Sequence, residues 1–440
     1  MSRRIQAAFI LLALTVGSAP AAGRAAQDWR EPALSSFDEA WQTINDTFFD
    51  PSFGGLDWSG VHDELRPMAE AATSLAGVRD VIREMLGRLE RSHFVLIPSS
   101  SVTGGPTGAA VVPIQVRVAD AGLVVTSVDT DSTASQAGLR PGQVILSVDD
   151  QTYESWQEAA VGESDRVRDL DVWRRGWRAL HGPPASVARL RVRDADGRES
   201  DLEVERAAER GELVRFGNLP PLYVRVEPEE HQTPGGRRVG VVAFNAWMAA
   251  AGNPLAEAVE RFRDADGLVF DLRGNMGGLV DMIRGVSGHV LNEHISLGSM
   301  QTRQALLELI ANPRRSTSDG RSVEPFAGPV AVLVDELTAS ASECFAGGLQ
   351  SLGRARVFGR QTMGQALPAV TRTLANRDVL MYVIGDFVTP TGVRLEGDGV
   401  RPDEVVDLSL ADLAQGRDGP LEAALAWMDT AGAVGYSSGR

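Results

Sequence analysis

The sequence predicts a multi-domain α/β protein with a small helical region, a β-rich module and a larger α/β core. Three patterns indicate this. Apolar residues recur at helical spacing between residues 35 and 92, and short strand-like runs fill residues 109–207. From Arg238 onward, strand-like and helix-like segments alternate. Such alternation is typical of a partly parallel sheet covered by helices.

Residues 1–26 have the features of a secretory signal peptide. Two arginines precede a short apolar run at residues 7–16, and small residues follow around Ala19 and Ala21. The apolar run is too short to cross a membrane. We therefore expect a secreted, periplasmic protein that is not an integral membrane protein, with a mature chain beginning between Ala22 and Gln27.

The composition narrows the classes of partner. The formal net charge is −16, which argues against binding to nucleic acid or an anionic membrane. All 43 basic residues are arginine, so the chain has no lysine. Cys344 is the only cysteine, which rules out an intramolecular disulfide, and a buried helix position suits it better than a nucleophile's role. We find no metal-ligand spacing and no phosphate-binding loop, so we expect no metal and no cofactor.

The region from residue 35 to 100 is predicted to be an N-terminal helical domain. Helices are expected near residues 35–48, 58–72 and 75–89, where apolar residues recur three and four apart. The third has one apolar face formed by Val78, Val81, Ile82, Met85, Leu86 and Leu89. Ser92-His93 and a strand-like run at residues 95–97 follow it.

The region from residue 106 to 207 is predicted to be a β-rich module with a helical insertion. Strands are expected at residues 111–118, 123–128, 144–148, 187–192 and 200–204, with a short helix at 131–139 and a long charged helical segment from Tyr153 to His181. The run from Ser132 to Asp149 resembles a bacterial PDZ domain. PDZ domains bind a chain terminus as an added strand, and the alternative is a structural spacer.

The core, residues 235–410, is organised around the stretch from Val330 to Gln350. A buried strand passes through a turn into a helix that begins near Ser340. The first N–H groups of such a helix have no partners within it and can hold a developing oxyanion. Ser340 is therefore a candidate nucleophile, or it is a helix cap that forms a capping box with Glu343.

A second loop of the core also follows a predicted strand. The strand at residues 267–272 ends in a glycine-rich turn containing Gly277-Gly278. Ligand sites of α/β sheets lie at the carboxyl ends of strands, so we expect this turn and Ser340 to share one site. A C-terminal helix and tail, residues 411–440, complete the chain.

Four motifs occur in one order behind the PDZ-like module: DLRGNMGG at 271–278, TASASE at 338–343, GRQTMG at 359–364 and EGDGVRPD at 396–403. Together they resemble the S41 peptidases, the C-terminal processing or tail-specific proteases, over residues 36–407. The resemblance implies a crotonase/ClpP-like catalytic core and a serine endopeptidase. Its substrates would be protein or peptide C-terminal tails docked by the PDZ domain.

The site residues that this resemblance implies depart from the common pattern of the family. Most members use a Ser–Lys dyad, in which the serine matches Ser340 and the lysine falls at Gln365. A glutamine side chain cannot accept a proton at useful pH, and no lysine exists elsewhere in the chain. A Ser–Lys mechanism is therefore excluded for the isolated chain.

A tricorn-like branch of the family uses a histidine base that lies before the PDZ domain, as His93 does here. By this resemblance Ser340 is the nucleophile, His93 the base, and Ser92 and Glu396 support them, with Asp398 as the alternative acid. The oxyanion hole would be formed by the N–H groups of Gly277 and Ala341, and Gly278 and Gln365 are assigned to substrate binding.

A different class of function remains open from the sequence. Gln365 could mark a lost dyad on a retained scaffold, which predicts a catalytically inactive protein that binds a peptide or an apolar ligand. The sequence also leaves homo-oligomeric assembly open.

Overall fold

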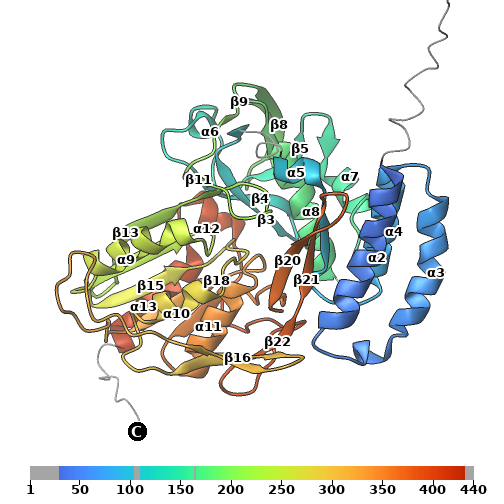
Figure 1. The fold of residues 1–440 in the computed structure, drawn as a ribbon. Coiled ribbons are helices and arrows are strands. Elements are labelled where there is room, and N and C mark those ends of the chain that lie inside the picture. The colour runs from blue at the N-terminus through green and yellow to red at the C-terminus, as the bar shows by residue number, and fades with distance from the viewer. Residues whose placement is uncertain (1–28, 104–109, 163–164, 432–440) are drawn as a thin grey trace, which may run out of the picture.

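The computed structural model describes residues 29–103, 110–162 and 165–431. The predicted signal peptide and the last nine residues of the predicted tail lie outside the described residues. The predicted domain boundaries remain predictions, whereas the class of fold is confirmed: helices at the N-terminus, a PDZ-like β module and an α/β core (Figure 1).

The N-terminal helices are those the apolar spacing predicts. They are α2 (Arg30–Thr47), α3 (Trp58–Ala71) and α4 (Leu75–Gly87), and the side chain of Ser74 caps the start of α4. The strand β1 (Val95–Ile97) and the short helix α5 (Ser99–Thr103) follow. Val78, Ile82 and Met85 of α4 are fully buried in a shared cluster with apolar residues of α2 and α3. Burial of one stripe per helix is what the 3.6-residue period provides.

This helical layer also packs against the core. β1 pairs with β21 (Val379–Val383), which pairs with β20 (Ala369–Thr373), and Leu380 and Val383 of β21 join the helical cluster. Arg79 of α4 donates two hydrogen bonds of 2.7 Å to the carboxylate of Asp378, which is fully buried. Figure 1 shows these helices beside β20 and β21 although almost 300 residues separate them in the chain.

The PDZ-like module is an antiparallel sheet in the order β3-β4-β5-β8-β9. The predicted strand at 111–118 is interrupted at Val112-Pro113, where proline has no N–H for a ladder. The predicted helical segment from Tyr153 to His181 is two helices, α7 and α8. The elements are β2 (Ala110–Val111), β3 (Ile114–Ala119), β4 (Gly122–Val128), α6 (Thr133–Gln136), β5 (Val144–Val148), β6 (Gln151–Thr152), α7 (Tyr153–Glu158), α8 (Asp165–Leu180), β7 (His181–Gly182), β8 (Val187–Arg193), β9 (Glu199–Glu205) and β10 (Ala207–Ala208).

The core contains the expected partly parallel sheet, in the order β13-β14-β15-β18-β19-β23. Every neighbouring pair from β14 to β23 is parallel, and β13 is antiparallel to β14. The strands are β13 (Val226–Gln232), β14 (Arg238–Phe244), β15 (Gly267–Asp271), β18 (Val330–Val334), β19 (Arg356–Gly359) and β23 (Glu404–Val405).

Helices cover both faces of this sheet, as the continuous apolar run of β18 predicts. Val330, Val332 and Val334 pack with α9 (Gly252–Arg261), α10 (Asp281–Ser287) and α11 (Ala341–Ser351). Ala331 and Leu333 face α13 (Gly419–Ala431) on the other side. The alternation follows the two-residue period of a strand.

A smaller antiparallel sheet, β17-β16-β22, and a two-stranded ribbon, β11-β12, have no counterpart among the sequence predictions. Their bounds, with the short helix before α13, are β11 (Glu212–Val214), β12 (Leu222–Val224), β16 (Ser296–Thr302), β17 (Leu306–Ile310), β22 (Gly385–Val388) and α12 (Leu410–Ala414).

Candidate active site

Ser340 occupies the sharp turn between β18 and α11, at the carboxyl end of a central strand. Its backbone has φ 57° and ψ −120°, a conformation that L-residues rarely adopt and that stores strain. The turn before it is held by hydrogen bonds between Asp335 and Thr338, one of 2.9 Å to the threonine hydroxyl and one of 3.0 Å between backbone groups. The surrounding structure thus fixes the strained turn that presents the Ser340 side chain.

Glu343 holds this turn from beneath. Its carboxylate accepts the N–H of Ser340 at 3.0 Å, which is the half of the predicted capping box that Glu343 supplies. It also accepts hydrogen bonds from the hydroxyl of Thr362 (2.5 Å) and from the N–H groups of Gly364 (2.7 Å) and Gln365 (3.0 Å). Burial raises the pKa of Glu343 to about 7, and these four hydrogen bonds oppose the rise. The carboxylate therefore ties α11 to the loop at 362–365.

His93 reaches Ser340 from a segment 247 residues earlier. The pairing of β1 with β21 begins two residues after His93 and places it, so that its Nε2 lies 3.3 Å from the Ser340 Oγ. Its Nδ1 lies 2.7 Å from the Ser92 Oγ. Burial lowers the pKa of His93 to about 4, so the imidazole is neutral near pH 7 and can accept a proton.

Glu396 completes the chain of contacts behind His93. Its carboxylate accepts the Ser92 N–H at 3.0 Å, the Ser92 hydroxyl at 2.9 Å and the Ala366 N–H at 3.1 Å. Since the single hydroxyl proton of Ser92 is donated to Glu396, the Ser92 oxygen accepts from Nδ1–H of His93. That arrangement leaves the lone pair of Nε2 directed at Ser340.

The two candidate acids of the late motif, Glu396 and Asp398, lie in different surroundings. Burial raises the pKa of Glu396 within the site. The exposed carboxylate of Asp398 instead lies 3.4 Å from Arg401. The structure thus brings Glu396, and not the side chain of Asp398, to Ser92.

The glycine turn after β15 lies directly against the turn that contains Ser340. A Cβ placed on Gly277, whose φ is +98°, would lie 2.6 Å from the Cβ of Ser340, so only glycine fits there. The N–H of Gly277 donates to the Asn275 Oδ1 at 3.0 Å, and Ala341 is the first residue of α11. A Cβ placed on Gly278 would likewise lie 2.4 Å from the carbonyl oxygen of Trp247.

Gln365 contributes its backbone to this turn. Its carbonyl accepts the Ser340 N–H at 2.8 Å, while its own N–H is bound by Glu343. Its side chain is half-buried and lines the cavity in front of Ser340. Sequence reasoning did not find the roles of Thr362 and Ala366, because only the folded loop brings their polar atoms to Glu343 and Glu396.

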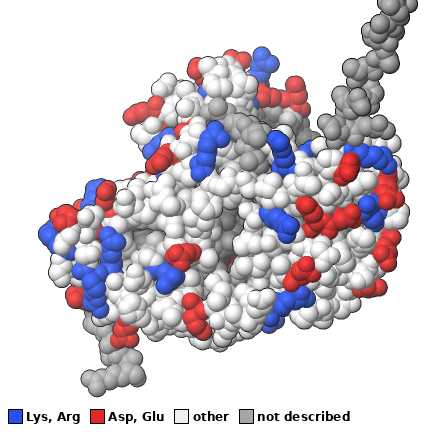
Figure 2. Space-filling view, viewed as in Figure 1, with Lys and Arg blue, Asp and Glu red and all other residues white. Residues whose placement is uncertain are grey.

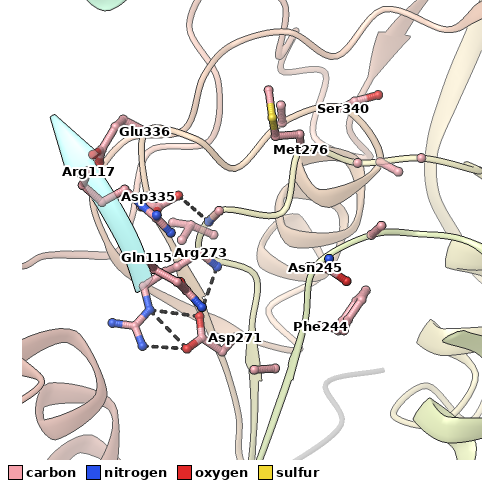
Figure 3. Close-up of a pocket in the computed structure, with 18 of the residues that line it drawn as sticks. Gln115, Arg117, Phe244, Asn245, Asp271, Arg273, Met276, Asp335, Glu336 and Ser340 are labelled. Atoms are coloured by element: carbon pink, nitrogen blue, oxygen red, sulfur yellow. Dashed lines mark hydrogen bonds and ion pairs between the residues drawn. The ribbon is translucent and has the colours of Figure 1, made fainter. Parts of the chain in front are cut away.

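The site opens into a cavity of about 1690 Å³ between the core and the PDZ-like module. Ser340 and Met276 lie on one side of it, and Gln115 and Arg117 of β3 lie on the other (Figure 3). Arg117 forms a 2.5 Å ion pair with Asp335, and both side chains are buried. Although burial opposes it, Arg117 lowers the pKa of Asp335. This pair joins β3 to the turn that precedes Ser340.

The described residues contain neither a metal-binding cluster nor a helix able to span a membrane. Among residues 29–103, 110–162 and 165–431, no group of three or more His, Cys, Asp or Glu side chains is arranged to hold a metal ion. No helix within these ranges is long and apolar enough to span a membrane. Acidic and basic side chains are interspersed on the face seen in Figure 2. Cys344 is buried in α11, as its position predicted.

Comparison with known proteins finds a match for each of the three regions of the fold. Residues 238–406 match the model of peptidase family S41, residues 28–87 the tricorn protease C1 domain, and residues 124–174 the PDZ domain. A probable CtpA-like serine protease of Staphylococcus aureus is 26% identical over 288 residues, 65% of this chain and 50% of that protein. The chain thus spans about half the length of this curated relative.

Two solved structures share the fold over most of their length. The photosystem II D1 C-terminal processing protease matches with a TM-score of 0.55 and 23% identity over 85% of this chain and 93% of that one. Mature CPAF matches with a TM-score of 0.58 and 14% identity over 92% of this chain and 97% of that one. The chain thus contains a domain of peptidase family S41 at residues 238–406, which follows regions that match the tricorn protease C1 domain and a PDZ domain.

Proposed function

We propose that this protein is a serine endopeptidase of the C-terminal processing type, with Ser340 as nucleophile and His93 as base. The observation that carries the proposal is the unbroken series of hydrogen bonds from Glu396 through Ser92 and His93 to the Ser340 hydroxyl. A nucleophile, a base and a group that orients the base are the parts that acyl transfer by serine requires.

Each group has a defined step in the proposed mechanism. The Nε2 of His93 takes the Ser340 proton as the Oγ attacks the scissile carbonyl carbon. The N–H of Ala341, at the positive end of α11, holds the oxyanion together with Gly277 once that N–H exchanges Asn275 for the substrate. The imidazolium then protonates the leaving amine, and the peptide bond breaks to give an acyl-enzyme.

Hydrolysis of the acyl-enzyme reuses the same groups. His93 takes a proton from water, and the resulting hydroxide attacks the ester carbonyl. The bond to the Ser340 Oγ breaks, the oxygen regains its proton from His93, and a peptide with a new carboxyl terminus leaves. Ser92 and Glu396 keep the proton on Nδ1 of His93 throughout, so that Nε2 alone gains and loses a proton, and Gly278 and Gln365 contact the substrate beside the nucleophile.

We propose further that protein or peptide C-terminal tails dock on the PDZ domain and enter the cavity that separates it from the core. Support comes from the cavity itself, which is lined both by β3 and by Ser340. The predicted signal peptide supports a secreted, periplasmic location. A catalytically inactive binding protein is the less favoured alternative, because His93 lies within reach of the Ser340 hydroxyl and can accept its proton in place of the missing lysine.

Labelling with a fluorophosphonate, read by intact mass, tests the proposal. We expect one adduct on the wild-type chain at Ser340, none on Ser340→Ala, and none on His93→Ala. His62→Ala is the matched control, since His62 lies on α3, where it contacts Asp38 of α2 rather than the site. Digestion of casein should follow the same order. Labelling that survives in Ser340→Ala would refute the assignment of the nucleophile, and labelling that survives in His93→Ala would refute that of the base.

A further inference from the structure

Arg166, at the start of α8 in the PDZ domain, is inserted between two loops of the core. Its Nη1 lies 3.1 Å from the carbonyl oxygen of Thr362 and 3.2 Å from that of Met363. The same nitrogen lies 3.2 Å from the carbonyl of Gly397 and 3.5 Å from that of Asp398. A guanidinium that is always charged thus faces four carbonyl oxygens from two segments that are about 35 residues apart.

These two loops carry the groups that orient the proposed site. The first, residues 361–366, supplies the Gln365 carbonyl to Ser340 and the Ala366 N–H to Glu396. The second, residues 395–400, supplies Glu396 itself. They are also bound to one another, because the N–H of Gly397 donates to the Gly364 carbonyl at 2.8 Å and the N–H of Thr362 donates to the Val400 carbonyl at 3.1 Å.

α8 meets the nucleophile's turn by apolar packing as well. Leu170 of α8 is buried with Leu337 and Ala339, which precede Ser340, and with Met363, while Trp173 packs against this cluster. The contact is continuous with the Arg166 contacts, since Met363 belongs to both. α8 therefore rests on the turn before Ser340 and on the two loops that contain Gln365 and Glu396.

We propose that Arg166 is a positioning residue, which sets the spacing of the 361–366 and 395–400 loops and thereby the hydrogen bonds from Glu396 to Ser340. The inference rests on the proposed function, because it concerns the geometry of that site. Arg166 touches neither the nucleophile nor the base, so it acts through the loops. Without the guanidinium, the four carbonyl oxygens repel one another, and the contact between the 361–366 and 395–400 loops weakens. Small displacements of a reacting pair are costly, since about 1 Å can lower a rate on the order of a hundredfold.

The test compares the full-length wild-type chain with Arg166→Ala, Arg166→Lys and Arg168→Ala. Arg168 lies on the same helix but contacts Gly162 and Asp165 of its own segment, so its removal is the matched control. The measurements are the rate of fluorophosphonate labelling at Ser340 and the kcat and KM for a fluorogenic peptide. Circular dichroism and denaturant midpoints report folding.

For Arg166→Ala we expect labelling and kcat to fall about tenfold to a hundredfold with KM changed little. Arg166→Lys should recover part of the loss, and Arg168→Ala should match the wild type. Wild-type labelling rates in folded Arg166→Ala overturn the inference but leave the proposed function intact, whereas a wild-type chain that does not label overturns the proposed function. If Arg166→Ala does not fold, Arg166→Gln is judged by the same rates, and a folded Arg166→Gln that labels as fast as the wild type overturns the inference.

Discussion

Replacing Glu396 with glutamine should reverse the hydrogen bonds that orient His93. The carboxylate oxygens accept three hydrogen bonds, from the Ser92 N–H, the Ser92 hydroxyl and the Ala366 N–H. An amide has only one oxygen, so in either orientation its NH₂ group faces a backbone N–H. If the NH₂ group lies beside the Ser92 oxygen, the hydroxyl turns toward Nδ1 of His93, and the proton moves to Nε2. His93 can then no longer accept the proton of Ser340.

The magnitude follows from this loss of the base. A base held in the wrong tautomer costs about a thousand- to ten-thousandfold in kcat, which equals about 4–5.5 kcal/mol of transition-state stabilisation at 1.36 kcal/mol per tenfold. The opposed donors should also lower the free energy of unfolding by about 1–3 kcal/mol. The assay is kcat for peptide hydrolysis together with fluorophosphonate labelling of the folded variant.

Asp398→Asn is the matched control, because this carboxylate lies in the same loop, is exposed and faces Arg401. It should keep wild-type activity. The reasoning is refuted if folded Glu396→Gln retains more than about a tenth of the wild-type kcat, since the orientation of His93 would then not depend on the acid.

The remaining predictions concern His93, Gly277 and Gln365. The pKa of His93 is about 4 when folded and 6.5 when unfolded, so its contribution to stability is present above pH 6.5 and is lost as the pH falls toward 4. Relative to His93→Gln, the wild type should lose about 2 kcal/mol of unfolding free energy between pH 7.5 and pH 5, and denaturant titrations that give parallel losses would contradict this. Gly277→Ala places a Cβ 2.6 Å from that of Ser340 and should slow labelling about a hundredfold or more, whereas Gly285→Ala, with open space around its Cβ, should not. Gln365→Lys should keep its labelling rate within about tenfold, since the backbone bonds at this position persist; complete loss would assign a role to the glutamine side chain.

Much of the fold could be predicted from local sequence patterns. The apolar residues from Val78 to Met85 recur at helical spacing, which predicted α4, because only one face of that helix is buried. The continuous apolar run of β18 predicted a strand, because both of its faces are buried. β17 (Leu306–Ile310) had no such pattern, because Leu306 and Leu307 are exposed and only Leu309 is buried, and its strand conformation comes from pairing with β16. The break between α7 and α8 was likewise not marked by any proline.

The site could be predicted only as far as its motifs reach. Ser340, His93 and Glu396 each stand in a recognisable local pattern, and the structure brings all three together. The second use of Glu343 as the acceptor of three donors from residues 362–365 had no local signal, since it depends on how two loops meet. The role of Arg166 had no local signal either, because the same charged helix contains several arginines, and the sequence does not distinguish the one that contacts the core from those that face solvent.

The absence of a lysine at position 365 changes which contacts the activity depends on. A dyad would lie wholly within the core, but the base that we propose, His93, comes from a segment before the PDZ domain and is held at 3.3 Å from Ser340 by the register of β1 on β21. That register is fixed by the helical cluster and by the two hydrogen bonds between Arg79 and the buried Asp378. Without Arg79, the buried Asp378 carboxylate would keep its hydrogen bonds from the Ser99 N–H and the Asn376 amide, but α4 would lose its polar link to the turn before β21. In the proposed mechanism the N-terminal helices are therefore part of the catalytic architecture, because the position of His93 depends on how they pack against β21.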